Sequence, residues 1–210
     1  MTSPTIPLMY LDHMPAVATL AAISSRYPSA SDASIIRRAE VCLHEAAHLL
    51  VAVALNAPVG EIVVSSHGGR VWVGFLDERD VLISIAGVAM ELCLHPDFST
   101  VFTAAANDGE NMRGMLESSG MTYDQAVAYA RRCLPEMVGM LNHEQVWDLV
   151  DWLASRLGTH ASKSGGRIRP RRVQQIVTEL EQRLRLKQDN TAARIVRQRI
   201  EMLVDELRRY

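Results

Sequence analysis

Cysteine is scarce in this chain of 210 residues, with three present at Cys42, Cys93 and Cys133. An odd number of cysteines at scattered positions does not form a disulfide framework. A domain of this length buries enough apolar surface to fold without such crosslinks. We therefore expect three buried thiols and a reducing, cytoplasmic location.

Long apolar runs and a basic N-terminus are also missing. No Lys or Arg precedes Arg26, so we expect no secretory signal peptide. The most apolar stretch, 41–59, is interrupted by His44, Glu45 and His48, and so lacks the roughly 20 consecutive apolar residues of a transmembrane helix. The phosphate-binding motif GxxxxGK[ST] is absent as well. We expect a globular domain with no membrane contact and no ATPase activity of its own.

The formal net charge of −2 hides an uneven distribution. Residues 1–164 carry 10 Lys and Arg against 18 Asp and Glu, whereas residues 165–210 carry 12 against 6. A basic tail is compatible with nucleic-acid binding, but the tail lacks aromatic residues that would stack on bases, apart from Tyr210. We therefore favour a solvated helical face, or docking of the tail on the body within or between chains.

Apolar periodicity and turn residues predict an α+β fold that is mostly α-helical, with a small sheet beside a zincin-type helix. That helix is capped by Asp32 or Ser34 and runs to about Leu55, where Asn56 and Pro58 stop it. The other expected elements are a short helix at 14–23, a hairpin of strands 61–65 and 71–76, helices at 80–94 and from 107 to 120, a helix at 122–134 opened by a Thr122–Gln125 capping box, a helix at 135–157 opened by Pro135, a flexible loop at 158–167, and helices at 170–187 and 190–209.

The segment HEAAH at residues 44–48 fits the metal-binding pattern HExxH. Residues four apart lie one turn above each other on a helix, so His44 and His48 can bind one metal ion. Glu45 lies beside that edge, where it can hold and deprotonate a water molecule. Two imidazoles and a carboxylate are costly to bury in an apolar helix without a shared partner. The pattern therefore predicts a metal site rather than a pair of core histidines.

A catalytic zinc site takes three protein ligands and keeps one position open for water. No third histidine follows HEAAH at close spacing, because the next residues are aliphatic. The third ligand must therefore come from a distant part of the chain. The candidates are Glu91, His95, Asp108, Glu110 and His67.

Four segments in the same order resemble the peptidase domain of FtsH-type AAA+ membrane metalloproteases, over roughly residues 34–180. HEAAH is similar to the HEAGH of that family's zinc helix. The segment 86–91 (AGVAME) resembles its AGxxAE helix, 103–108 (TAAAND) its TGAxND segment, and 120–122 (GMT) its GMS stretch. The resemblance implies a stand-alone peptidase domain, because the family's transmembrane and ATPase parts have no counterpart here.

The resemblance also implies roles for individual residues. Zn²⁺ is the implied cofactor, with Asp108 as the third ligand beside His44 and His48. Glu45 becomes the catalytic base, and Glu91 an acidic residue that supports the site rather than binding the metal. The chain departs from the family at Ala47 and Ala104, which replace glycines, and at 109–113, which replaces LxxAT. These departures leave the ligands in place and affect the expected substrate pocket.

The sequence thus predicts a zinc-dependent metalloendopeptidase that cuts unfolded or flexible segments of a protein or peptide substrate without ATP. Residues 31–164 form the predicted peptidase domain, 1–30 a segment of unassigned structure, and 165–210 a basic helical region that packs on the domain or mediates self-association. A second copy of the chain, or a separate ATPase that delivers substrates, is compatible with this prediction. The sequence does not separate broad proteolysis from cleavage of one regulatory protein.

The alternative is a catalytically inactive zinc-binding interaction domain. In that case the basic helical tail binds a partner or a nucleic acid. A metal whose fourth position is filled by Glu91 or His95 would favour this alternative, because a closed site is structural.

Overall fold

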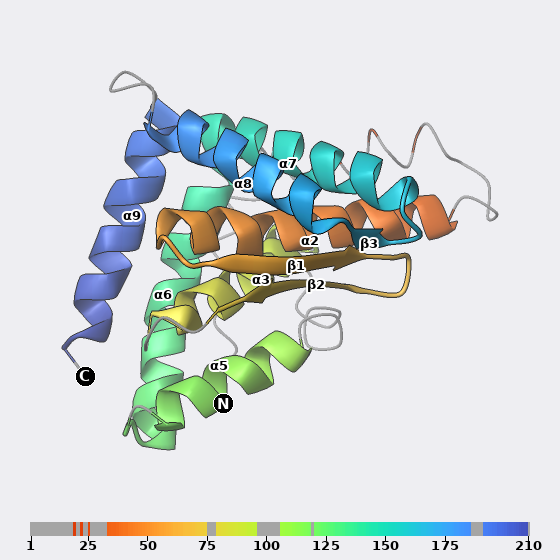
Figure 1. Cartoon of the computed structure of the whole chain (residues 1–210). Coiled ribbons are helices and arrows are strands. Elements are labelled where there is room, and N and C mark those ends of the chain that lie inside the picture. The colour runs from red at the N-terminus through yellow and green to blue at the C-terminus, as the bar shows by residue number, and fades with distance from the viewer. Residues whose placement is uncertain are drawn as a thin grey trace.

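The computed structural model describes residues 33–74, 79–95, 106–118, 120–185 and 191–209, together with residues 19, 22 and 25. It has the predicted α+β fold, mostly α-helical (Figure 1). The predicted helix at 14–23 lies largely outside the described residues. The described elements are α2 (Ala33–Ala54), β1 (Val59–Val64), β2 (Gly69–Val73), α3 (Asp80–Leu94), α5 (Ala106–Ser118), α6 (Tyr123–Leu141), α7 (Glu144–Ser162), β3 (Arg167–Ile168), α8 (Pro170–Arg185) and α9 (Thr191–Leu207).

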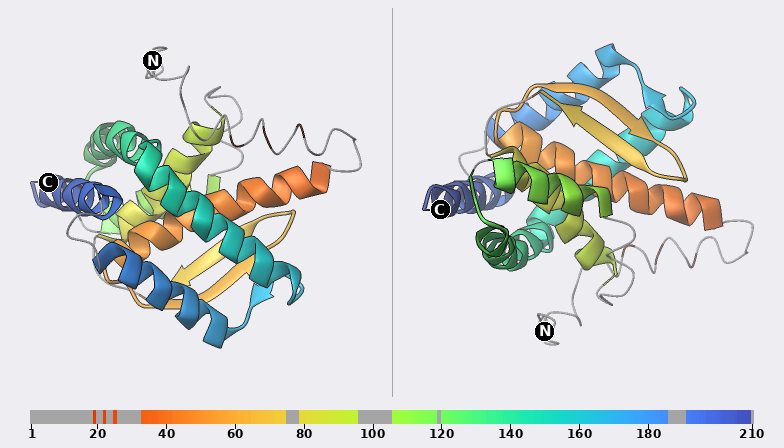
Figure 2. Two further views of the ribbon diagram at one scale, coloured as in Figure 1. Left: turned by 90° about the horizontal axis from the view of Figure 1, so that it is seen from above. Right: turned by 90° about the horizontal axis from the view of Figure 1, so that it is seen from below.

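Helix α2 crosses the centre of the molecule and is surrounded by other elements (Figures 1 and 2). Buried residues occupy nearly every position from Val41 to Val53, as expected of a helix that is apolar on all sides. Helices α3 and α7 pack against it. The helix ends where predicted: Asn56 takes a left-handed conformation with φ 59°, and Pro58 follows.

A three-stranded antiparallel sheet lies along α2, with strand order β2–β1–β3. Strands β1 and β2 form the predicted hairpin, paired from Val59 with Val73 to Val64 with Gly69. Ile62 and Val64 are buried, while Trp72 on the other face is 57% exposed. In the strand order β2 is an edge strand, and its Gly69 and Val71 lie against Glu45 in the middle of α2.

The prediction of a flexible loop at 158–167 is wrong at both ends, since only residues 163–166 form turns between α7 and β3. Helix α7 continues through Gly158 to Ser162, and the chain then forms β3, in which Ile168 pairs with Ile62. A Cβ atom at Gly158 would lie 3.4 Å from Sγ of Cys42. The glycine therefore allows α7 and α2 to approach closely rather than ending the helix.

The predicted start of a helix at Pro135 is also wrong. The Thr122–Gln125 capping box opens α6 as predicted, with hydrogen bonds of 2.8 and 3.3 Å, but α6 runs through Pro135 to Leu141. The proline removes one helical hydrogen bond. A continuous buried stripe compensates for this loss; its members on both sides of the proline are Ala126, Tyr129, Ala130, Cys133, Met137, Val138, Met140 and Leu141.

The basic tail packs on the body of the domain. Helix α8 contacts β1 and α2, and α9 contacts α6 and α7. Ion pairs join Arg132 to Glu206 and Arg199 to Glu136 across the α6–α9 contact. Among the described helices, none has the length and apolarity required to cross a bilayer. The three cysteines are free and buried, as predicted.

Candidate metal centre

Two imidazoles from α2 form the base of the site. His44 and His48 lie one helical turn apart, with side chains that are 12% and 10% exposed. Their Nε2 atoms lie 3.0 Å apart, and their ring centroids are 4.7 Å apart. Both rings are therefore held within a largely buried part of the molecule and aim the same nitrogen at one point.

Helix α3 fixes the orientation of both rings through their other nitrogens. Nδ1 of His48 lies 2.7 Å from the backbone oxygen of Ile83, and Nδ1 of His44 lies 3.0 Å from Oε1 of Glu91. A carbonyl or carboxylate oxygen only accepts hydrogen bonds, so each Nδ1 carries a proton and donates it. The Nε2 atom of a neutral imidazole then presents a lone pair. Such support of a ligand histidine by a carboxylate or carbonyl is typical of metal sites.

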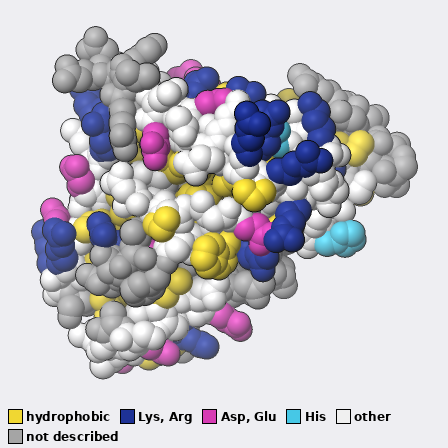
Figure 3. Space-filling model, viewed as in Figure 1, with side chains coloured by type: hydrophobic (Ala, Val, Ile, Leu, Met, Phe, Trp, Pro, Cys, Tyr) yellow, Lys and Arg dark blue, Asp and Glu magenta, His cyan; other side chains and the backbone are white. Residues whose placement is uncertain are grey.

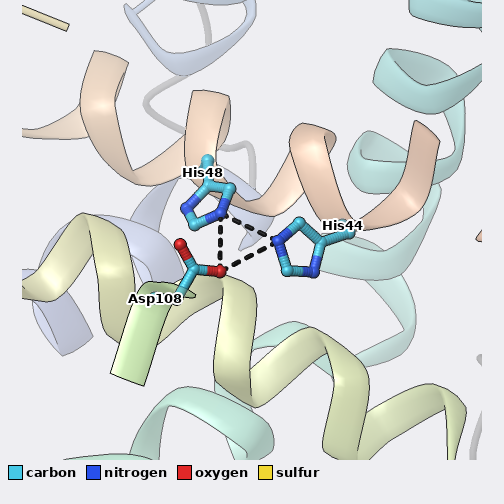
Figure 4. Close-up of side chains that lie close together, drawn as sticks. All are labelled: His44, His48 and Asp108. Atoms are coloured by element: carbon cyan, nitrogen blue, oxygen red, sulfur yellow. Dashed lines mark hydrogen bonds and ion pairs between the residues drawn. The ribbon is translucent and has the colours of Figure 1, made fainter. Parts of the chain in front are cut away.

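Asp108, from the first turn of α5, completes the cluster. Its Oδ2 atom lies 3.0 Å from Nε2 of His44 and 3.2 Å from Nε2 of His48. The three side chains point toward one another from two different elements (Figure 4). The structure thus brings together the two histidines and the carboxylate that the sequence suggested, although 60 positions separate His48 from Asp108 in the chain.

These three atoms fit a divalent ion. Ligands about 2.0–2.1 Å from a tetrahedral zinc ion lie about 3.3 Å from one another, close to the observed 3.0–3.2 Å. Two lone pairs and a carboxylate oxygen this close together repel one another unless a positive charge lies among them. Two imidazole nitrogens and one carboxylate oxygen form a donor set suited to zinc and to other first-row divalent metals.

Gly87 of α3 provides the space that the cluster occupies. A Cβ atom at this position would lie 2.4 Å from Cε1 of His48 and 2.5 Å from Oδ2 of Asp108. Neither ligand has room to retreat without leaving the cluster. The sequence showed this glycine as part of a motif but gave no indication of its role as a spacer.

Glu45 lies in the same cavity and is 2% exposed. The backbone N–H of Val71, on β2, hydrogen-bonds its carboxylate. A Cβ atom at Gly69 would lie 2.5 Å from Oε1 of Glu45, so the bare backbone of β2 lets the strand approach this side chain. The other oxygen, Oε2, is buried with no hydrogen-bond partner among the described residues. Burial raises the pKa of Glu45 above its ordinary value, against the opposing effect of the two histidines, which makes the carboxylate a stronger base.

In the metal-free cluster, burial and the neighbouring side chains determine which group carries a proton. Burial disfavours an imidazolium at His44, but hydrogen bonds to Asp108 and Glu91 outweigh it and raise the pKa of His44 to about 10. Burial likewise disfavours the Asp108 carboxylate, but hydrogen bonds from His44 and His48 lower its pKa below the ordinary value. A proton on His44 therefore supplies the positive charge in the absence of a metal.

The cluster opens into a cavity of about 800 Å³, bounded by α2, α3, α5 and strand β2. The remaining candidate ligands lie elsewhere or serve other roles. His95 lies 3.4 Å from Glu40 on α2. Glu110 is exposed on α5, and His67 lines the cavity from the hairpin turn without joining the cluster. Glu91 contacts Nδ1 of His44 rather than the point where the three ligand atoms meet.

Comparison with known proteins adds no relative to this description. No protein-family profile, curated protein or solved structure matches the chain.

Proposed function

We propose that this chain is a zinc-dependent metalloendopeptidase of FtsH-like type that hydrolyses peptide bonds in unfolded or flexible segments. One observation carries the proposal: a convergent His44–His48–Asp108 cluster and a buried glutamate lie in one open cavity. We also propose that the chain is related to the FtsH-type peptidase domain and that it acts in a reducing, cytoplasmic compartment.

The residues divide the chemistry as follows. His44, His48 and Asp108 hold the ion, and a bound zinc ion supplies a Lewis acid that polarises the scissile carbonyl and makes water more acidic. Glu45, whose Oε2 has no hydrogen-bond partner among the described residues, accepts a proton from the attacking water and returns it to the leaving amine. Glu91 and the Ile83 carbonyl keep both imidazoles in the required tautomer.

Strand β2 is suited to hold the substrate. It forms an edge of the sheet and lines the cavity through Arg70, Val71 and Val73. An extended peptide can pair with such an edge by main-chain hydrogen bonds. A folded protein does not offer an extended segment of this kind, so the substrate is unfolded, flexible, or delivered by a separate ATPase.

The described residues give less support to a purely structural metal site. A structural zinc ion takes four protein ligands. Three ligands converge here, while Glu91 contacts His44 and His95 pairs with Glu40. The described residues therefore supply no fourth protein ligand, and the cluster opens into the cavity, where a bound ion would be accessible to water.

The direct test is the substitution Glu45→Gln in the full chain loaded with zinc. The amide cannot accept the proton, so cleavage of an unfolded test protein is expected to fall by about 10²–10⁴-fold while zinc content stays the same. Glu110→Gln, on the exposed side of α5, is the matched control and retains wild-type turnover. Unchanged turnover in Glu45→Gln would remove Glu45 from the mechanism, and a zinc-loaded wild type without any turnover would favour the inactive interaction domain.

A further inference from the structure

A strongly basic surface lies at the end of α7, on β3 and at the start of α8. Residues 152–178 contain no Asp or Glu. Figure 3 shows Lys and Arg side chains gathered over this part of the molecule. We call this surface the basic patch; its members are Arg156, Lys163, Arg167, Arg169, Arg171 and Arg172, and the last five are exposed in full or large part.

Few acidic groups neutralise the basic patch. Glu179 binds Arg156 at 3.0 Å, and Glu61 of β1 pairs with Arg167. Within the described part of the chain, no ion pair involves Lys163, Arg169 or Arg171. The pKa of the nearby His160 is lowered by burial and then by Arg172, Arg156 and Lys163, as expected where several cations share one region.

The basic patch is continuous with the cavity of the metal centre. Glu61 forms ion pairs with Arg167 of the patch and with Arg70. Arg70 in turn lines the cavity. Strand β3, which carries Arg167, pairs with β1, and β1 pairs with the cavity-lining β2. One three-stranded sheet therefore connects the patch to the site.

We propose that the basic patch binds an acidic, flexible segment of the substrate protein, next to the segment that enters the cavity. This inference rests on the proposed peptidase function, because it names the class of substrate that the site receives. The cavity lining mixes acids (Glu45, Asp80, Glu91 and Asp108) with Arg37 and Arg70, whereas residues 152–178 include no acid, so an acidic segment is attracted more strongly to the patch than to the cavity.

An acidic polypeptide fits the patch better than a nucleic acid does. Proteins that bind single-stranded nucleic acid combine a basic groove with aromatic side chains that stack on the bases. Residues 153–209 contain no Phe, Trp or Tyr, and the ring of the preceding Trp152 is already occupied by Arg183 and Arg156, at 4.1 and 5.9 Å from its centroid. The patch offers exposed guanidinium groups, which match carboxylates, and its strand β3 lies in the same sheet as β2, the edge strand that suits an extended peptide.

Binding to the full chain carrying Glu45→Gln tests the inference without cleavage. Fluorescence anisotropy is measured with labelled Gly/Ser peptides that carry either six Glu or six Gln, and with a single-stranded DNA of equal charge. The patch variant is Arg167→Gln/Arg169→Gln/Arg171→Gln. The matched control removes three exposed arginines of the α9 region, Arg194→Gln/Arg197→Gln/Arg208→Gln. A charge-conserving variant with Lys at the three patch positions tests charge against local structure.

The acidic peptide is expected to bind about tenfold more tightly than the neutral peptide at low salt, since three or more exposed ion pairs each contribute a small amount. The preference disappears in the patch variant and in about 0.5 M salt, and it survives in the α9 and lysine variants. Equal binding of the two peptides, equal loss in the α9 variant, or tighter binding of the DNA than of the acidic peptide would overturn the inference.

The failure of this inference and the failure of the proposed function are distinguishable. Peptide binding is measured without turnover, so it reports on the patch alone. Turnover of an uncharged unfolded substrate by zinc-loaded wild type reports on the metal site alone. In the active enzyme, a Glu-rich extension on such a substrate is expected to lower KM severalfold with little change in kcat, and an unchanged KM would contradict the role of the patch in substrate binding.

Discussion

The carboxylate of Glu91 accepts a hydrogen bond of 3.0 Å from Nδ1 of His44, and this contact links α3 to α2, the helix that carries both histidines of the cluster. Glu91 is 4% exposed, and its second oxygen has no hydrogen-bond partner among the described residues. A buried carboxylate in this position is stabilised by the hydrogen bond it accepts, and it holds the ring with Nε2 directed at the cluster. The contact therefore fixes His44 in the tautomer and orientation that a metal ligand would need.

Replacing Glu91 by Ala is expected to weaken zinc binding by about 10–100-fold, because His44 loses the group that fixes its tautomer and orientation. Competition against a chromophoric chelator measures the affinity. Glu110→Ala, an exposed glutamate on α5, is the control and retains wild-type affinity. Equal affinities in wild type and Glu91→Ala would show that the contact does not prepare the ligand.

Gly87→Ala is expected to lower zinc affinity more than tenfold, since its Cβ atom would lie within 2.5 Å of atoms of His48 and Asp108. Gly139→Ala in α6 meets no atom within 4 Å and is the matched control. It gains helix propensity and is expected to raise the free energy of unfolding by up to about 1 kcal/mol. Isothermal titration with zinc and thermal denaturation of both variants separate the two effects. Retention of zinc by Gly87→Ala would refute the spacer role.

Gly69→Ala is expected to keep the metal and lose turnover. The added Cβ atom would lie 2.5 Å from Oε1 of Glu45, so the carboxylate must move or β2 must shift away. His44, His48 and Asp108 lie on other elements and are left in place. Zinc content and cleavage of an unfolded protein are measured on the same sample. A fall in zinc content equal to the fall in turnover would show that Gly69 acts on the whole site.

The stability of the metal-free protein is expected to depend on pH in a defined direction. The raised pKa of His44 stabilises the fold fully below 6.5, its ordinary value, and this contribution is lost as the pH rises through about 10. The lowered pKa of Asp108 stabilises the fold above 3.8, its ordinary value, and this contribution is lost as the pH falls through the lowered value. The two contributions are therefore both present between these two ordinary values.

Bound zinc is expected to stabilise the protein more as the pH rises, because the metal must displace the proton from His44. The rise in Tm produced by excess zinc over a chelator is expected to grow from pH 6 to pH 9 (about one proton released per ion bound). Thermal denaturation across this pH range measures the effect. The control is Asp108→Asn, which lacks the carboxylate of the cluster. A zinc-induced rise in Tm that is independent of pH would place the ion away from His44.

Much of the fold follows from apolar periodicity. The limits of α3 match the prediction, and α2 ends at the predicted stop signals, because each helix is apolar over a long run bounded by residues that cannot continue it. Pro135 and Gly158 mislead because tertiary packing outweighs their local preferences. The stripe of α6 stays buried across Pro135, and Gly158 faces Cys42 of the neighbouring helix. Strand β3 is too short for a detectable alternation.

The residues of the candidate site also differ in how far the sequence predicts them. Side chains with a distinctive spacing, His44, Glu45 and His48, are predictable because helix geometry alone places them together. The resemblance pointed to Asp108, since no periodic pattern connects it to α2. The Ile83 carbonyl and the space beside Gly87 carry no side-chain signal, so the groups that orient His48 and make room for the cluster are recognisable only in three dimensions.

Metal content is the measurement that tests the account most directly. Purified wild type is dialysed against trace zinc, and the bound ion is quantified by mass spectrometry alongside His48→Ala and Asp108→Ala. We predict about one zinc ion per wild-type chain. Both variants are expected to lose most of the bound zinc, because two ligands do not retain the ion. A wild type that binds no divalent metal, or variants that bind as much as wild type, would contradict it.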